Sequence, residues 1–386
     1  MSVNKPQFFR RSAKKIIPRL TSIYSSVAHG LLLALLVIFL GSGMLSGYHV
    51  LKRHFRPPPA LDAQLLKPVH PHLSEAQIRK MLAETYFEDP FVYAAYTGFK
   101  ERPRSGSFVS VSPEGFRFNN DKSQSISGSR LKKICIFGGS TVFGYGVDDS
   151  NTITAHLQEI LNKKYPHAAY SVFNFGRGFY YSGQESILFQ ALIRDGVRCE
   201  IAIFIDGVNE NQLVPNFTDR QQQLFSQYNY HPVRFFLSGL ERSTLISDIS
   251  RVVGGSPPPR PEPPVSVFVD GYVRSRAIIQ HLGAVSATKA IFIIQPVPGF
   301  RNSFATFKFQ SSYCAPQLPC EPSSLARIPR IESMAKLADG RTTHDFTGIF
   351  SDTTTLPFLD DVHYTPAANR KIAEAIAPLL FPTTPN

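Results

Sequence analysis

An aspartate and a histidine near the C-terminal end of this 386-residue chain have the spacing of a catalytic pair. In Asp360-Asp361-Val362-His363, a carboxylate stands three residues before an imidazole. It can accept the Nδ1–H of the imidazole and leave Nε2 free to take a proton from a serine hydroxyl. Gly138-Gly139-Ser140-Thr141 offers that serine, since the glycines permit a sharp turn that exposes it. Each motif also has an ordinary alternative: a surface Asp–His pair, and a serine that caps a helix.

Two further segments could stabilise the negative charge that forms when a serine attacks an ester carbonyl. Asn174-Phe175-Gly176-Arg177-Gly178 contains two glycines whose backbone N–H could approach the oxyanion. Gly178 is preferred, with Gly176 as its rival, and an ordinary tight turn is the alternative. Asp206-Gly207-Val208-Asn209-Glu210 offers the Asn209 amide as a donor, with an Asx-turn as the alternative.

The order Gly-Gly-Ser-Thr, Asn-x-Gly, Gly-x-Asn-Glu and Asp-x-x-His resembles the four sequence blocks of the SGNH (GDSL-like) hydrolases, over about residues 131–382. The resemblance implies Ser140 as nucleophile, His363 as general base and then acid, and Asp360 as the residue that orients it. It also implies an oxyanion hole made of the Ser140 N–H, a glycine N–H of the second block and the Asn209 side chain.

The sequence departs from the family pattern at two positions. Gly139 stands where the first block usually has Asp, and Glu210 stands where Asp often follows the third-block asparagine. Asp361 is a rival to Asp360, but only Asp360 has the family spacing.

The elements that must hold these residues alternate between apolar strands and amphipathic helices. Continuous apolar runs separated by helices predict a parallel sheet covered on both faces, with ligands beyond the carboxyl ends of its strands. We therefore expect an α/β fold: a three-layer α/β/α sandwich of the SGNH or flavodoxin-like kind, with a mainly parallel sheet. The predicted strands are Ile134–Phe137, Tyr170–Phe175, Ile201–Ile205 and Ala290–Gln295, and the helices are Thr154–Lys164, Gln184–Arg194, Val273–Leu282 and Ala367–Leu380.

The N-terminus indicates a membrane anchor. The net charge of +12 could indicate nucleic-acid binding, but half of it comes from six basic residues within the first 24, ahead of an apolar run. We expect a basic cytoplasmic tail (1–26) and a transmembrane signal anchor (27–48), the alternatives being a cleaved signal peptide or a buried helix. The positive-inside rule places the main domain outside the cytoplasm, and we expect no nucleic-acid partner.

Between the anchor and the main domain we expect a connector and accessory segment (49–130). Its helix, Ser74–Thr85, would begin with a capping box of Ser74 and Gln77. Short strands and turns should follow over 86–130. The main domain, 131–382, contains an insertion at about 215–264, which is either a flexible surface loop or a lid.

The four cysteines are compatible with an oxidising compartment. Cys314 and Cys320 bracket a loop-like segment and could form a disulfide. We interpret Cys135 and Cys199, in or beside apolar strands, as buried small hydrophobic residues. No Cys/His spacing resembles a zinc site, so we expect neither a metal nor a cofactor.

These residues predict a serine esterase that acts on an acyl ester, on a carbohydrate or lipid near the membrane. The same triad could instead transfer an acyl group to a sugar hydroxyl. A non-catalytic glycan-binding or scaffold protein that retains the fold is the alternative from a different class. The sequence gives no oligomeric state.

Overall fold

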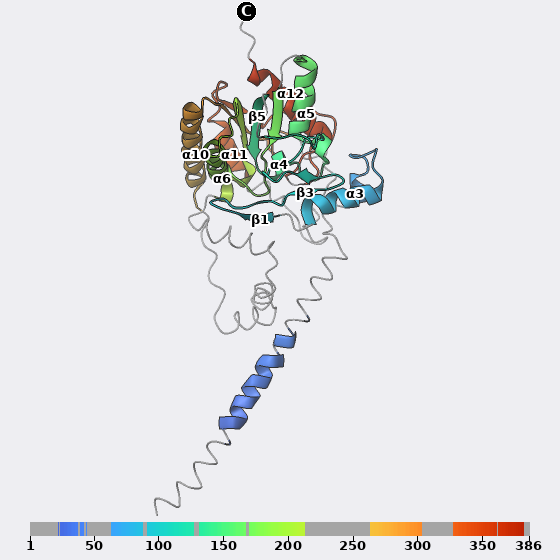
Figure 1. Ribbon diagram of the computed structural model, residues 1–386, viewed down its shortest axis with the longest axis vertical. Helices are drawn as coiled ribbons and strands as arrows, with labels where there is room; N and C mark the ends of the chain where they lie inside the picture. Colours follow the sequence, from blue (N-terminus) through green and yellow to red (C-terminus); the bar gives the residue numbers. More distant parts are fainter. Residues whose placement is uncertain are drawn as a thin grey trace, which may run out of the picture. The chain divides into compact units, whose positions relative to one another are not determined.

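The computed structural model describes residues 22, 24–37, 39–41, 44, 63–87, 91–126, 131–166, 170–212, 263–302, 327–360 and 362–381 (Figure 1). The chain divides into two units. One unit comprises residues 1–56 and 230–259, and the other comprises residues 57–229 and 260–386.

The second unit is built on a five-stranded parallel sheet with the strand order β6-β5-β7-β8-β9. The order reverses at β5, the strand that leads to Ser140. Four of these strands were predicted, whereas β9 has three residues and carries no apolar run. The strands are β5 (Lys132–Gly138), β6 (Tyr170–Asn174), β7 (Ile201–Asp206), β8 (Lys289–Ile294) and β9 (Thr343–Asp345).

Helices cover both faces of the sheet, which confirms the three-layer α/β/α prediction. Figure 1 shows α5 (Ile153–Lys164) with α12 (Pro366–Leu380) on one side, and α6 (Ser182–Arg194) with α10 (Val265–Ser286) on the other. The helix α11 (Ile328–Ala335) packs against α10.

Alternate residues of each strand enter two separate cores. In β5, Ile134 and Ile136 pack with the α5–α12 side, whereas Cys135 and Phe137 enter an aromatic core that also holds Phe204 of β7. Because both faces of the central strands are buried, apolar residues occupy successive positions along each of them.

Some boundaries differ from the prediction for local reasons. The helix α10 begins at Val265, eight residues before the predicted start at Val273, because Pro264 adopts the extended N-cap geometry there. Short elements that periodicity does not reveal are α4 (Ser140–Phe143), η2 (Asp149–Asn151) and η3 (Val208–Gln212).

The accessory segment consists of short elements, as predicted. Its helix α3 (Glu75–Leu82) starts at the predicted capping box, in which Ser74 and Gln77 bond each other's backbone. The π-helical turn η1 (Ala83–Phe87) continues from α3. Two antiparallel pairs follow: β1 (Phe91–Ala94) with β2 (Gly98–Glu101), and β3 (Arg104–Ser105) with β4 (Ser110–Val111). The helix α2 (Ala63–Leu66) precedes them.

Arg117 joins the accessory segment to the main sheet. Its backbone N–H donates to the Asn174 carbonyl at the end of β6 (2.9 Å). Its fully buried guanidinium donates to Asp149 (2.9 Å) and to the carbonyls of Phe143, Gly144 and Val147. The accessory segment therefore braces the turn that follows α4.

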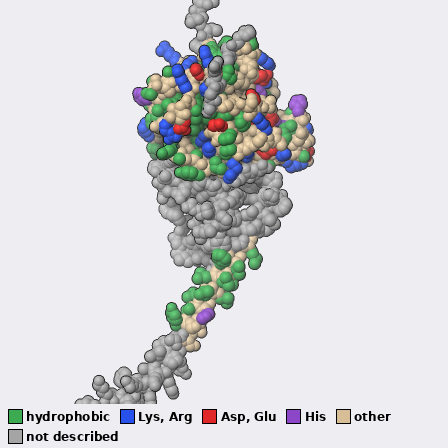
Figure 2. All heavy atoms as spheres, in the orientation of Figure 1, with side chains coloured by type: hydrophobic (Ala, Val, Ile, Leu, Met, Phe, Trp, Pro, Cys, Tyr) green, Lys and Arg blue, Asp and Glu red, His purple; other side chains and the backbone are tan. Residues whose placement is uncertain are grey.

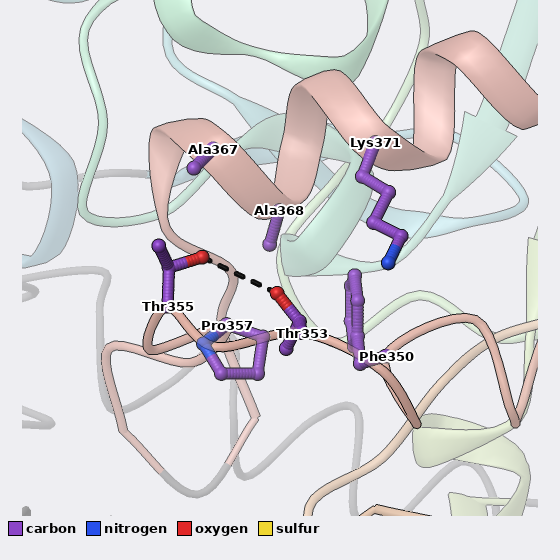
Figure 3. Close-up of a pocket in the computed structure, with 7 residues that line it drawn as sticks. All are labelled: Phe350, Thr353, Thr355, Pro357, Ala367, Ala368 and Lys371. Atoms are coloured by element: carbon purple, nitrogen blue, oxygen red, sulfur yellow. Dashed lines mark hydrogen bonds between the residues drawn. The ribbon is translucent and has the colours of Figure 1, made fainter.

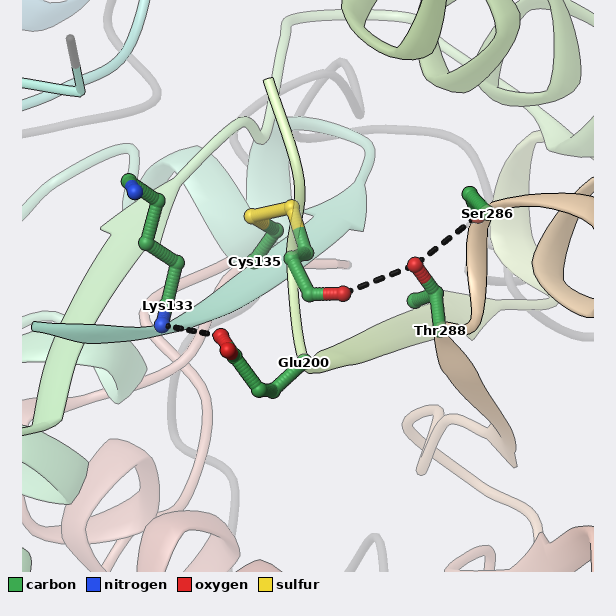
Figure 4. Close-up of a disulfide and its surroundings, with 6 residues drawn as sticks. Lys133, Cys135, Glu200, Ser286 and Thr288 are labelled. Atoms are coloured by element: carbon green, nitrogen blue, oxygen red, sulfur yellow. Dashed lines mark hydrogen bonds between the residues drawn. A yellow bond between two sulfur atoms is a disulfide. The ribbon is translucent and has the colours of Figure 1, made fainter. Parts of the chain in front are cut away.

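The interpretation of Cys135 and Cys199 as separate hydrophobic residues is wrong, because they form a disulfide (Figure 4). Both are buried, as expected, and their Cα atoms are 5.9 Å apart. The reason is the strand order: β5 and β7 are neighbours, and Cys199 lies just ahead of β7. Thr288 donates to the Cys199 carbonyl (2.7 Å) beside the bond. Cys314 and Cys320 lie outside the described residues.

In the first unit, the helix Tyr24–Gly41 is long and apolar enough to cross a membrane. No part of this stretch is buried inside the protein. Figure 2 shows mostly hydrophobic side chains on it. It overlaps the predicted anchor at 27–48, of which the last residues lie outside the described part of the chain. The predicted insertion at 215–264 also lies outside it, except for its last two residues.

Candidate active site

Ser140 lies at the carboxyl end of β5, where the chain turns sharply into α4. Gly139 is the N-cap of this short helix, and Ser140 is its first residue. A Cβ on Gly138 would overlap Val142 and lie 2.9 Å from the Ile205 carbonyl, which is why the turn needs glycine. The Ser140 hydroxyl therefore does not cap the helix and is left for another partner.

The carboxylate of Asp360 is held by hydrogen bonds from the backbone of the residues that follow it. Its Oδ1 accepts the N–H groups of Val362 and His363, both at 2.8 Å, and its Oδ2 lies 2.7 Å from His363 Nδ1. Burial opposes ionisation of Asp360, but the charge of His363 and these hydrogen bonds outweigh it and lower the pKa to about 2. Asp360 is thus a carboxylate at neutral pH.

His363 connects the carboxylate to the serine. Its Nε2 lies 2.8 Å from Ser140 Oγ, although the two residues are 223 positions apart in the sequence. The last helix begins just beyond, with Thr365 as N-cap and Pro366 in the first turn, as predicted. The structure thus brings the three residues Ser140, His363 and Asp360 into one hydrogen-bonded chain. Such a chain can remove the serine proton and orient the imidazole.

Asn209 lies beside the turn that carries Ser140. Its Nδ2 donates to the Tyr180 carbonyl (2.8 Å) and occupies the space that a Cβ on Gly139 would need. Because an amide nitrogen carries two hydrogens, a second donor remains. The Ser140 N–H donates to no acceptor among the described residues. Two N–H donors therefore lie at the turn that carries Ser140: the backbone N–H of Ser140 and the side-chain amide of Asn209.

The two glycines of the second block are differently engaged. The Gly178 N–H donates to Glu101 Oε1 (2.9 Å), and the Gly176 N–H donates to Asn174 Oδ1 (3.0 Å). Neither N–H is therefore available to an oxyanion in this structure. The sequence could not reveal this for Gly178, since Glu101 comes from the distant β1–β2 hairpin.

Two tyrosines that the sequence analysis missed surround His363. The Tyr145 ring is stacked on the imidazole, with centroids 5.4 Å apart and planes at 17°. The Tyr86 ring meets it edge-on, at 5.6 Å and 84°. Tyr145 lies five residues after Ser140, but Tyr86 is 277 residues from His363, and no local motif marks either.

Glu210, the residue after Asn209, is one of three buried carboxyl groups that interact with one another. The Glu210 carboxyl accepts both the N–H (2.9 Å) and the hydroxyl (2.8 Å) of Ser182 at the start of α6. Burial raises its pKa to about 7, against the effect of these bonds. Burial also raises the pKa values of Asp206 and Glu185 well above the ordinary range. Through Ser182, Glu210 therefore ties the loop that carries Asn209 to the start of α6.

A pocket lies beside the first turns of α12 (Figure 3). Thr355, Pro357 and Lys371 are among its lining residues, and the hydroxyls of Thr353 and Thr355 are 3.3 Å apart. None of Ser140, His363 and Asp360 lines it.

No family model and no curated protein matches this sequence. Solved structures with some likeness include a carbohydrate acetylesterase family member from Sinorhizobium meliloti (12% identity, TM-score 0.37, 65% of this chain and 97% of that one). Others are a psychrotrophic esterase from Pseudoalteromonas sp. (10%, 0.35, 64% and 96%) and a mutant of an acetyl-xylooligosaccharide esterase from Geobacillus stearmophilus (12%, 0.34, 66% and 96%). Likeness at this level assigns no activity to the chain.

Proposed function

We propose that this chain is a serine esterase in which Ser140 is the nucleophile, His363 the general base and Asp360 its orienting carboxylate. One observation carries the proposal: the unbroken chain from Ser140 Oγ to His363 Nε2 (2.8 Å) and from Nδ1 to Asp360 Oδ2 (2.7 Å). Its side chains are mostly buried, with 12% of His363 and 19% of Asp360 exposed, so these bonds are partly shielded from water.

The reaction has two balanced halves. In the first, Ser140 Oγ bonds to the ester carbonyl carbon while its proton moves to His363 Nε2. The carbon–alkoxy bond then breaks, and the same proton goes to the departing alcohol. In the second half, His363 takes a proton from water, and the hydroxide oxygen bonds to the acyl carbon. The bond between the acyl carbon and Ser140 Oγ then breaks. The carboxylic acid leaves, and the proton returns to Ser140.

Asp360 and the oxyanion donors lower the barriers of both halves. The ionised Asp360 stabilises the imidazolium that forms twice per turnover. The Ser140 N–H and the Asn209 amide would donate to the carbonyl oxygen as it becomes negative. A single donor of this kind is worth about 2.7–4 kcal/mol in known enzymes.

The proposal also assigns a location. The helix Tyr24–Gly41 would anchor the protein in a membrane, and the basic residues ahead of it favour a cytoplasmic N-terminus. The buried Cys135–Cys199 disulfide supports an oxidising compartment for the main domain. Acyl esters of carbohydrates or lipids near that membrane are the corresponding substrates.

The test uses the full-length protein in detergent, with p-nitrophenyl acetate as substrate and a serine-directed phosphonate as inhibitor. We expect turnover of the ester and inactivation by one phosphonate per chain. Adding sugar acceptors would reveal transfer as new sugar esters. A folded sample with neither turnover nor labelling would contradict the proposed esterase and favour a binding protein. For the location, a reporter fused after residue 60 should be active only outside the cytoplasm.

A further inference from the structure

A side chain of the accessory segment, Tyr86 of η1, contacts two of the proposed catalytic residues, Asp360 and His363. We infer that Tyr86 is a positioning residue that holds Asp360 and His363 in their working geometry, so that the segment before the main domain is part of the catalytic unit. This inference rests on the proposed function.

The Tyr86 hydroxyl lies against both members of the pair. Its oxygen is 3.2 Å from His363 Nδ1 and 3.4 Å from Asp360 Oδ2, to which it can donate. The hydroxyl therefore contacts both ends of the hydrogen bond between His363 Nδ1 and Asp360 Oδ2. A donor to Oδ2 resists rotation of that carboxylate, and a fixed carboxylate keeps the imidazole turned with Nε2 toward Ser140.

Ring contacts restrict the imidazole further. Tyr145 covers one of its faces, and Tyr86 meets it edge-on. The two tyrosine rings also support each other edge to face, with centroids 5.0 Å apart and planes at 81°. The Tyr145 hydroxyl is in turn tied to the buried Glu101 of β2 (3.1 Å). A histidine that must move protons in both directions is therefore confined by two rings anchored elsewhere in the fold.

The residues of η1 directly before Tyr86 are held by hydrogen bonds, as a positioning role requires. The neighbouring Glu84 is buried and accepts three N–H groups, from Ser107 (3.1 Å), Phe108 (2.8 Å) and Val109 (3.0 Å). The hydroxyl of Thr85 donates to the Met81 carbonyl (2.6 Å). Three hydrogen bonds to one buried carboxyl group tie η1 to the loop 107–109.

The side chain of Tyr86 is also packed against the main domain. It lies against the buried cluster that contains Leu82 of α3, Val147 after α4, and Leu359 directly before Asp360. The accessory helix, the turn after the nucleophile and the loop of the Asp–His pair therefore meet around one tyrosine. A change in any of them would be transmitted to the pair through Tyr86.

The deciding variant is Tyr86→Phe in the full-length protein, since it removes the hydroxyl and keeps the ring. We expect kcat for p-nitrophenyl acetate to fall about tenfold, as for the loss of one hydrogen bond to a charged group, with KM unchanged. Without the hydroxyl, more of the Asp360 charge acts on the imidazolium, so the acid limb of the rate profile should move to higher pH. The thermal midpoint should stay within a degree or so of the wild type.

Tyr165→Phe is the matched control, because Tyr165 packs with Tyr170 and Phe381 and not with Ser140, His363 or Asp360. It should leave kcat and the pH profile unchanged. A Tyr86→Phe protein with wild-type kcat and pH profile would overturn the inference. So would an activity loss that merely follows the loss of folded protein. A wild type that neither turns over nor binds the phosphonate would instead overturn the proposed function, and the inference with it.

Discussion

The side-chain amide of Asn209 occupies the space that a Cβ atom on Gly139 would need. This contact explains why glycine, and not a residue with a side chain, precedes Ser140 in this protein. It also ties the first and third sequence blocks together, because the same amide donates to the Tyr180 carbonyl.

A substitution at Gly139 should therefore act through Asn209. We expect Asn209→Ala to lower kcat by about 10²–10³-fold, as for the loss of an oxyanion donor. Gly139→Ala should also lower kcat, because its methyl group displaces the amide. The double variant should be no slower than Asn209→Ala alone, since both changes remove the same group. Gly348→Ala, where a Cβ would only touch Arg301 at 3.9 Å, is the control. Additive losses in the double variant would refute this explanation.

The depressed pKa of Asp360 predicts a specific stability profile. Because the folded-state pKa is about 2, against an ordinary 3.8, the carboxylate stabilises the fold above pH 4 and loses that effect as the pH falls toward 2. The difference in unfolding free energy between wild type and Asp360→Asn should thus be about 2 kcal/mol at pH 6 and shrink below pH 4. Urea titrations at several pH values measure it. A difference that does not depend on pH would contradict the assignment.

The same Asp360→Asn variant should lose activity far more than stability. Its amide can present the wrong hydrogen-bonding group to Nδ1, and in Ser-His-Asp enzymes this change lowers kcat about 10⁴-fold. Retention of more than a tenth of the activity at neutral pH would exclude Asp360 as the orienting residue.

Glu101 should make stability depend on pH in the direction opposite to Asp360. Burial raises its pKa to about 7 from an ordinary 4.5, so the protein loses stability as the pH rises from about 4.5 to 7. The Gly178 N–H and the Tyr145 hydroxyl both donate to Oε1, and glutamine can keep both bonds. Glu101→Gln should match the wild type near pH 4.5 and exceed its stability at pH 8 by roughly 1–3 kcal/mol. Equal unfolding free energies at pH 8 would show that ionisation of the buried Glu101 carboxyl does not destabilise the fold.

The Cys135–Cys199 bond closes a loop with a sequence separation of 64. Replacing both cysteines by serine should lower the unfolding free energy by about 4 kcal/mol, the loop-closure value for this length. The native bond is buried, so a mild reductant should cleave it only when denaturant is added. Peptide mapping without reductant identifies the bond directly, and finding both thiols free in the folded, membrane-bound protein would contradict it.

Much of this architecture could be predicted from local patterns. Unbroken apolar runs such as Ile134–Phe137 predicted four of the five strands, and the Thr365-Pro366 signal predicted the start of α12. The spacing of Asp360 and His363 likewise depends only on a short loop.

Contacts between distant segments could not be predicted in this way. The cysteine pair required the strand order, in which β5 and β7 are neighbours. Glu101 takes the Gly178 N–H, and Tyr86 reaches His363, only after the accessory segment folds onto the main domain. Neither contact leaves a signal in the spacing of residues along the chain.

The most direct test of the central claim is the mass of the protein after reaction with a serine-directed phosphonate. We predict one adduct per chain, mapped to the peptide that contains Ser140, and no adduct on a folded Ser140→Ala variant, which should also have lost ester turnover. An adduct on another residue, or wild-type turnover by Ser140→Ala, would contradict the account.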